Sequence, residues 1–242
     1  MESFDLVLGL GMNEKSMGVL RKLEWVESFD NFLHFNFMLP FDYPYFVTKL
    51  WPSFRKAGNL ALRPFLLALY KKHSIPDPEN HITKLTGEQF QEFTTMMQKS
   101  RVDAWNIISP VRDQDFLKWR ISDSPNSDKY YYYRIDGFGA IIFLNDHSNK
   151  YIDILWVSDI TNHPAIRDMI SSLAIYGMRK GYSFSRFYTS DPELSSYLRK
   201  TTKSLVRRPK FAFFAKDTDL SNSIKSMSWN WELVDHDFEQ LQ

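Results

Sequence analysis

The run FDLVLGL (Phe4–Leu10), followed after two residues by NEKSMGVLRKLEW (Asn13–Trp25), decides the fold predicted for this chain. The first segment is apolar and has the length of a strand. The second begins with a good helix N-cap and has apolar residues at helical spacing. Aromatic and polar residues then alternate along Asn31–Leu39, as in a strand that buries at least one face. The first 39 residues therefore predict a strand, a helix (Glu14–Leu23) and a second strand.

The composition of the 242 residues is close to the globular average, with 43% hydrophobic and 24% charged residues. Aromatic residues are the exception at 16%, which suits well-filled sheet faces. The net charge of +1 gives no general attraction to nucleic acid or membranes, so nucleic-acid binding is not predicted. The absence of cysteine excludes disulfides and thiolate catalysis, and the six histidines are scattered, so no metal site is predicted. With no apolar run of membrane length and no signal-peptide pattern, we expect a cytoplasmic protein.

The middle of the chain predicts two helices, Tyr45–Lys56 and Leu60–Lys72, separated at Gly58. Pro64 falls in the first turn of the second helix, where its missing N–H is harmless. Ser74–Pro78 predicts a linker. From residue 80 onward the pattern predicts the elements of a whole small α/β domain: strands His81–Leu85, Tyr130–Ile135, Gly139–Leu144, Tyr151–Ile160, Tyr182–Thr189 and Phe211–Lys216, and helices Gly87–Lys99, Asp113–Ile121, Ala165–Lys180 and Pro192–Lys200.

The helix behind the first strand resembles an acyl-CoA-binding helix of the GNAT acyltransferase superfamily. The resemblance implies that Asn13, Ser16 and Lys22 contact acyl-CoA. Two positions differ from the family pattern. Leu20 stands where a tyrosine usually protonates the departing thiolate, and Glu24 stands where a turn glycine is usual. Five residues are in register with the family: Asn13, Ser16, Val19, Lys22 and Trp25.

Two further segments resemble a subgroup of tandem GNAT-like proteins, some of which sit with surface-polysaccharide genes. The first is Arg112–Arg120, followed by Pro125 and Tyr130, and the second is Trp231–Asp237. Together with the order of elements, these segments extend the resemblance over most of the chain.

The implied fold is α/β, a GNAT-like mixed sheet flanked by helices, with one complete domain and the C-terminal part of a second. Residues 1–40 would be the remnant of the first domain, 41–79 a helical connector and 80–242 the complete domain. Four strands and the cofactor loop of the first domain would then be missing. Because an unpaired strand edge is a liability, we expect Phe4–Leu10 to pair with the second domain or with another chain, as in a homodimer.

In that family the pyrophosphate of acyl-CoA is held by backbone N–H groups at a helix N-terminus, usually in a glycine-containing loop. The corresponding segment here is Ser158–Ala165, in which Thr161 and Asn162 are the predicted cofactor contacts. The segment has no glycine, Pro164 removes a donor, and Asp159 would repel phosphate. The alternative is a capped helix start that binds no CoA.

Two candidate general bases for deprotonating an amine are His163, which is near Asp159, and Asp153. Tyr188 and Tyr197 are the candidate acids toward the thiolate. Each has a structural alternative: a helix-start side chain for His163, the solvated face of a strand for Asp153, and core packing for the tyrosines.

A cluster of basic residues near the C-terminal end suits a CoA 3′-phosphate, a nucleotide-sugar diphosphate or an acidic glycan, and Arg199 and Lys203 are its predicted cofactor contacts. The alternative is a solvated helix end. The cluster consists of Arg199, Lys200, Lys203, Arg207, Arg208 and Lys210.

The predicted function is transfer of an acyl group, acetyl in the first instance, from acyl-CoA to a small-molecule amine or sugar acceptor. The acceptor would attack the thioester directly, without a covalent enzyme intermediate. The alternative is a non-catalytic GNAT-like module that binds a sugar, nucleotide or protein and has lost the CoA loop.

Overall fold

The computed structural model describes residues 6–12, 14–27, 35–40, 55–75, 78–99, 107–108, 113–125, 127–135, 139–146, 151–158, 161–202, 204–207, 210–215 and 217–229. Its strands are β1 Leu6–Met12, β2 Val26–Glu27, β3 Phe35–Pro40, β4 Ile82–Lys84, β5 Ile107–Ile108, β6 Tyr130–Ile135, β7 Gly139–Asp146, β8 Tyr151–Val157, β9 Phe184–Thr189, β10 Leu205–Arg207, β11 Lys210–Ala215 and β12 Ser228–Trp229. Its helices are α1 Glu14–Lys22, α3 Arg55–Lys71, α4 Gly87–Lys99, α5 Gln114–Leu117, α6 His163–Lys180, α7 Pro192–Thr201 and α8 Thr218–Ser226, with shorter turns η2 Pro78–His81, η3 Lys118–Ser122 and η4 Ser127–Lys129.

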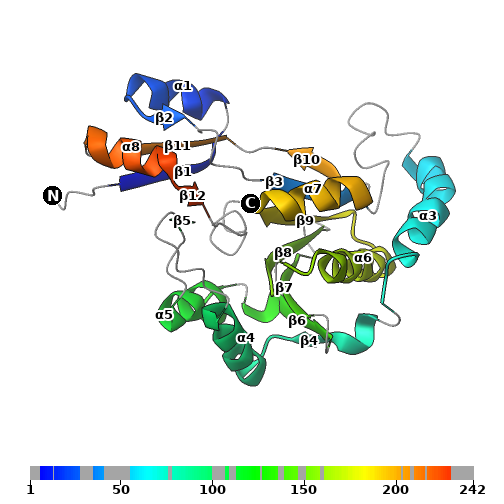
Figure 1. Ribbon diagram of the computed structural model, residues 1–242. Coiled ribbons are helices and arrows are strands. Elements are labelled where there is room, and N and C mark those ends of the chain that lie inside the picture. Colours follow the sequence, from blue (N-terminus) through cyan, green and yellow to red (C-terminus); the bar gives the residue numbers. More distant parts are fainter. Residues whose placement is uncertain are drawn as a thin grey trace.

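The main sheet has seven strands in the order β10-β3-β9-β8-β7-β6-β4. All neighbouring pairs are antiparallel except β8 and β9, which are parallel and connected through α6. Figure 1 shows α4 and α5 on one side of this sheet and α3 and α6 on the other. The predicted α/β class, a mixed sheet flanked by helices, is therefore confirmed.

The two ends of the chain exchange one strand each. β11, near the C-terminus, lies between β1 and β2 of the first segment, with Phe213 opposite both Leu8 and Val26. In return, β3 of the first segment lies between β9 and β10, with Phe37 opposite both Phe187 and Val206. The predicted pairing of the first strand with the C-terminal half is thereby confirmed, and neither strand–helix–strand unit is complete without a strand from the other.

The predicted break between two helices at Gly58 is wrong. The single helix α3 runs through Gly58 and contains Pro64 in its interior. Leu66 and Tyr70 are buried against α6 in the larger hydrophobic cluster. This packing outweighs the helix penalties of glycine and proline, which together amount to roughly 4 kcal/mol. Residues 45–54 of the other predicted helix, and the predicted hairpin turn at residues 136–137, lie outside the described residues.

The long helix α6 forms the centre of the larger core. Its N-cap is Asn162, and Gly181 ends it in the left-handed conformation with φ 80°, as glycine commonly does. All residues from 169 to 178 are buried, so the helix is covered by β-strands, α3 and α7. No helix in the described ranges has the length and hydrophobicity needed to cross a membrane.

The smaller core, on the opposite face of the sheet, offers a matched pair of tyrosines. Tyr130 and Tyr132 are both at most 2% exposed. The Tyr130 hydroxyl donates to the Arg120 carbonyl at 3.3 Å. The Tyr132 hydroxyl has no hydrogen-bond partner among the described residues, and burial raises the pKa of Tyr132 to about 12.

We expect Tyr130→Phe to lower the free energy of unfolding by about 1 kcal/mol, because it removes a hydrogen bond and leaves a buried carbonyl with one acceptor site unused. Tyr132→Phe should leave stability unchanged or raise it by up to about 1 kcal/mol, because it removes a buried hydroxyl that has no partner. Urea denaturation of both variants measures the difference. Equal losses in the two variants would contradict this assignment.

Candidate functional site

The candidate site lies where the two parallel strands of the sheet stop pairing. β8 and β9 are in register from Tyr151 opposite Phe184 to Ile154 opposite Phe187. Both strands continue further, β8 to Val157 and β9 to Thr189, but each then pairs only with its outer neighbour, β7 or β3. The carboxyl ends of the two strands therefore separate, and ligands of open α/β sheets bind outside such ends.

A β-bulge marks the same place. Ile142 of β7 is opposite Trp156, whereas the next residue, Phe143, is opposite Ile154. Leu155 is therefore an extra residue in β8, one position beyond the last pair with β9. Bulges bend a strand and often lie beside functional sites, because they redirect side chains and end pairing.

The start of α6, directly beyond β8, has its backbone donors already in use. Ala165 N–H donates to the Asn162 side chain at 3.3 Å, and Ile166 N–H donates to the Asn162 carbonyl at 3.0 Å. His163 N–H donates to the Thr161 carbonyl at 3.0 Å, and the proline that follows has no N–H. These bonds agree with the alternative given for Ser158–Ala165, a capped helix start. The three N–H groups named here form no open anion-binding site.

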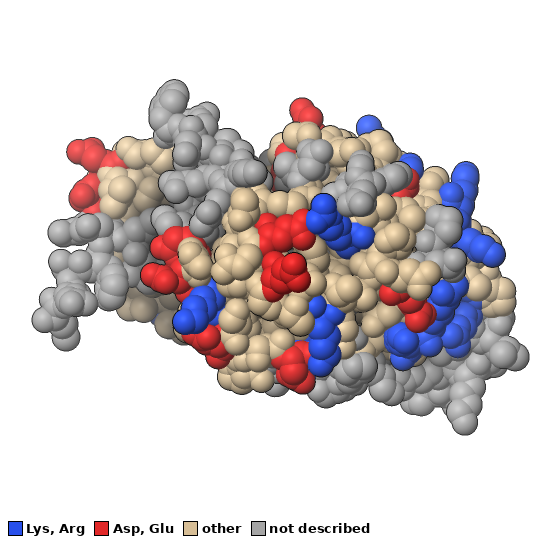
Figure 2. Space-filling model, turned by 90° about the horizontal axis from the view of Figure 1, so that it is seen from below, with Lys and Arg blue, Asp and Glu red and all other residues tan. Residues whose placement is uncertain are grey.

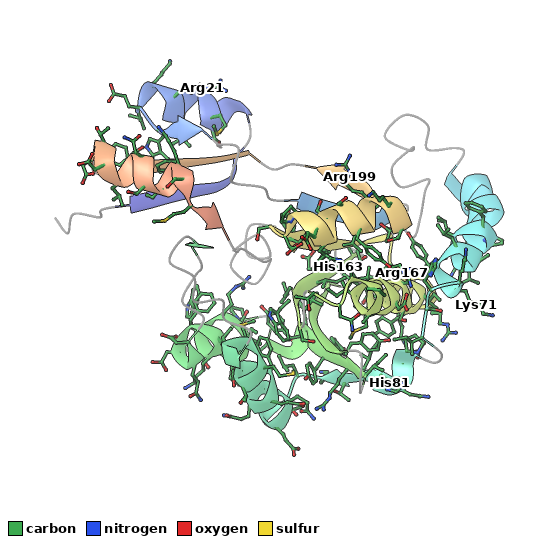
Figure 3. The ribbon with its side chains drawn as sticks, viewed as in Figure 1. Arg21, Lys71, His81, His163, Arg167 and Arg199 are labelled. Atoms are coloured by element: carbon green, nitrogen blue, oxygen red, sulfur yellow. The ribbon has the colours of Figure 1, made fainter. Side chains whose placement is uncertain are left out.

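A polar cluster connects the first half of α6 with α7. The His163 ring is partly buried, and its centroid is 5.6 Å from that of Tyr197. The Tyr197 hydroxyl accepts a hydrogen bond from Arg167 Nη1 at 3.0 Å, so it keeps its own proton to donate. Arg167 Nε also donates to Asp168 Oδ1 at 2.8 Å. Figure 3 shows His163 and Arg167 on α6, close to α7. Burial and then the charge of Arg167 lower the pKa of His73, at the end of the helix that packs on α6.

Asp153 lies in the middle of β8 and forms a buried ion pair. It is 1% exposed, so the alternative that it lies on a solvated strand face is wrong. Arg186, its register partner on β9, donates to both carboxylate oxygens, each at 2.5 Å. The Arg186 guanidinium also lies 4.5 Å from the centroid of the Tyr151 ring. Burial by itself would lower the pKa of Arg186, but the hydrogen bonds and charge of Asp153 raise it above its usual value.

The structure does not gather all the predicted catalytic residues. Tyr188 is buried in the smaller core, together with Leu155 and Trp156, whereas Tyr197 packs against the larger core on the other face. His163 lies beside Tyr197 and therefore on the other face from Tyr188. The roles of His163, Asp153 and Tyr188 stay predictions.

The predicted cofactor contacts are divided between two regions. Thr161 and Asn162 are exposed at the start of α6, and Arg199 is exposed in the last turn of α7. Ser16 and Lys22 lie on α1, which belongs with the separate sheet β1-β11-β2. Figure 3 shows the neighbouring Arg21 well apart from His163. Asn13 and Lys203 lie outside the described residues.

Two polar residues of this region were not predicted as site residues. Arg186 could have been found, because FSRFYT and YIDILWV are neighbouring apolar strands with one charged residue each, and opposite charges there predict a pair. Arg167 gave no comparable signal. Its partners are one and thirty residues away in the sequence, and the distant one depends on how α7 packs on α6.

No protein-family model and no curated protein matches the sequence. Solved structures that resemble the chain include a functionally unknown conserved protein from Staphylococcus epidermidis, with 12% identity, a TM-score of 0.46 and coverage of 88% of this chain and 73% of that one. N-myristoyltransferase of Saccharomyces cerevisiae, solved with myristoyl-CoA, has 9% identity, a TM-score of 0.45 and coverage of 76% and 50%. A GCN5-related glucosamine N-acetyltransferase region of a fungal multi-domain β-N-acetylglucosaminidase has 11% identity, a TM-score of 0.42 and coverage of 85% and 24%. The chain thus spans half or less of the two named transferases.

Proposed function

We propose that the chain is a GNAT-like acyltransferase that moves an acyl group, acetyl in the simplest case, from acyl-CoA to an amine or sugar acceptor. The observation that carries the proposal is the end of pairing between the parallel strands β8 and β9 after Ile154 and Phe187. The pantetheine arm of CoA is extended and contains two secondary amides, so it can pair with strand backbone as an added strand does. Such an arm would satisfy backbone groups that the separated strands leave without a strand partner.

The chemistry assigned to this place is direct attack of an amine on the thioester carbonyl. A base must take the amine proton, and the departing thiolate must receive one. We assign the first role to His163, which is only partly buried at the carboxyl end of β8. The second suits Tyr197 better than Tyr188, because the Tyr197 hydroxyl accepts from Arg167 and is free to donate.

Two placements of the CoA phosphates follow from the residues. In the first, Thr161 and Asn162 lie near the diphosphate, and Arg199 with Lys203 meets the 3′-phosphate. In the second, CoA is held by α1 through Asn13, Ser16 and Lys22. We favour the first, because Thr161 and Asn162 directly follow the carboxyl end of β8, and α7, which carries Arg199 in its last turn, follows the carboxyl end of β9.

Isothermal titration with acetyl-CoA and with CoA tests the proposal, and we expect micromolar binding. Arg199→Glu should weaken binding by at least about tenfold, because it places a carboxylate where a phosphate is proposed. Lys72→Glu, at an exposed lysine just beyond α3, is the control and should bind as the unmodified chain does.

His163→Ala should retain binding and lose about 100-fold or more in turnover, the contribution of a general base. Asn13→Ala should weaken acyl-CoA binding only if the second placement, on α1, is correct. No binding of either ligand would refute the proposal.

One observation favours the alternative, a GNAT-like module that binds without catalysis. Three backbone donors at the start of α6, those of His163, Ala165 and Ile166, are used within the chain, so they are not available to a diphosphate. A chain that binds amino sugars or nucleotide sugars in the same titration, but neither CoA nor acetyl-CoA, would establish this alternative. The acceptor, a role with surface polysaccharides, the cytoplasmic location, the division at residues 40 and 79 and a homodimer all stay predictions.

A further inference from the structure

A cavity of about 480 Å³ lies between α3 and the C-terminal half of α6, and Ser74, Ile75 and Pro78 beyond α3 also line it. Its volume is within the range of small-molecule sites, roughly 300–1,000 Å³. The cavity adjoins residues 175–179 of α6, and the start of α6 at His163 is about 20 Å away along the helix axis. It is therefore separate from the candidate acyltransferase site. Figure 3 accordingly shows Lys71, on its α3 side, at the other end of α6 from His163.

The cavity has an apolar floor and a basic rim. Leu67, Ile175 and Met178 supply apolar surface, and Arg63 and Lys71 lie one helical turn on either side of Leu67. Leu67 is 39% exposed although it is a leucine on a helix whose other face packs in the core. An exposed leucine between two cations is a good contact for a ligand with both an apolar and an anionic part.

Among the described residues of this rim, the positive charges exceed the negative ones. Arg63 donates to a main-chain carbonyl of α6 at 2.8 Å, a partner that carries no formal charge. Arg179 and Lys180 share one carboxylate, that of Glu79, at 3.7 Å and 3.5 Å. Lys71 makes no ion pair within the described part of the chain. Figure 2 shows Lys and Arg side chains gathered toward the right of the face that it draws, the end at which α3 lies in Figure 1.

We infer that this cavity, named here the α3–α6 pocket, binds an amphipathic carboxylate of the fatty-acid type. Lys71 receives the carboxylate, Arg63 adds a second positive charge to the rim, and the chain lies along Leu67, Ile175 and Met178. A long-chain alcohol lacks the charge, and a short carboxylate lacks the apolar part, so each satisfies only half of the pocket. The inference does not depend on the acyltransferase proposal, because it concerns the opposite end of α6.

Titration calorimetry with octanoate, 1-octanol and acetate tests the ligand class. Octanoate has ten non-hydrogen atoms, and we expect saturable one-to-one binding with a Kd below about 1 mM. 1-Octanol and acetate should each bind at least about tenfold more weakly. Equal affinity for octanoate and 1-octanol would overturn the role of the cations, and an absence of saturable octanoate binding would overturn the site.

Three variants locate the binding. Lys71→Met should weaken octanoate binding about tenfold through loss of a charge-assisted contact, and Leu67→Gln should weaken it several-fold through loss of apolar contact. Lys72→Met, the neighbouring exposed lysine outside the pocket lining, is the control and should bind octanoate unchanged. All three side chains are exposed, so the thermal midpoints should stay close to one another. Equal affinity in Lys71→Met and Lys72→Met would show that these cations only stabilise the helix end.

Discussion

A chain that starts at residue 41 is expected not to fold cooperatively. It lacks β3, which lies between β9 and β10 with six register pairs to β9 and three to β10. It also lacks β1 and β2, so β11 loses both of its neighbours. Removing an interior strand exposes two edges and opens the larger core, and we expect the loss to exceed the net stability of a domain, about 5–15 kcal/mol. Far-UV circular dichroism, urea unfolding and size-exclusion chromatography of residues 41–242 measure it.

The matched experiment keeps every strand and removes only residues 76–77, and with them the covalent connection. Residues 1–75 and 78–242, co-expressed as two polypeptides with a tag on one, should copurify in a one-to-one complex. We expect this because β11 and β3 each complete the sheet of the other fragment. A soluble, monomeric 41–242 fragment with a sharp urea transition would show instead that the strand exchange is dispensable.

Most elements of the second half could be predicted from local pattern, because they are long and periodic. The helix ending at Gly181 and the strand Tyr130–Ile135 are examples. The elements that were missed are short, such as β2 and β10 with two and three residues, or weakly apolar, such as α8. Pattern gives no information about which of several compatible strands pair. The exchange of β3 and β11 therefore required the three-dimensional structure.

The candidate site could be predicted only in part for the same reason. The segment after β8 was identified from its place between a strand and a helix, as a cofactor-binding loop or a capped helix start. The separation of β8 from β9 depends on register, and the Arg167–Tyr197 contact depends on how two helices pack. Neither property repeats along the sequence, so neither leaves a periodic signal.

Removal of Asp153 is expected to cause the largest loss of stability from a single substitution. Asp153→Ala should lower the free energy of unfolding by about 3–5 kcal/mol, because it leaves the Arg186 guanidinium unpaired with its side chain 13% exposed. The double variant Asp153→Leu with Arg186→Met should recover most of this loss, since apolar residues of similar size often replace a buried ion pair without cost. Urea denaturation of Asp153→Leu, of Arg186→Met and of the double variant gives the coupling energy.

The exposed Glu79–Lys180 pair is the control. Its side chains are 43% and 45% exposed, so Glu79→Ala should cost no more than about 1 kcal/mol. A further variant, Asp153→Asn, distinguishes the two roles considered for Asp153. A general base contributes to turnover but not necessarily to stability, whereas a carboxylate whose two oxygens both accept from Arg186 contributes chiefly to stability. An Asp153→Asn chain that keeps its unfolding free energy and loses turnover would restore the catalytic assignment. If Asp153→Asn instead loses stability, and the double variant regains both the fold and acyl-CoA binding, the role of Asp153 is to stabilise the sheet that positions the site.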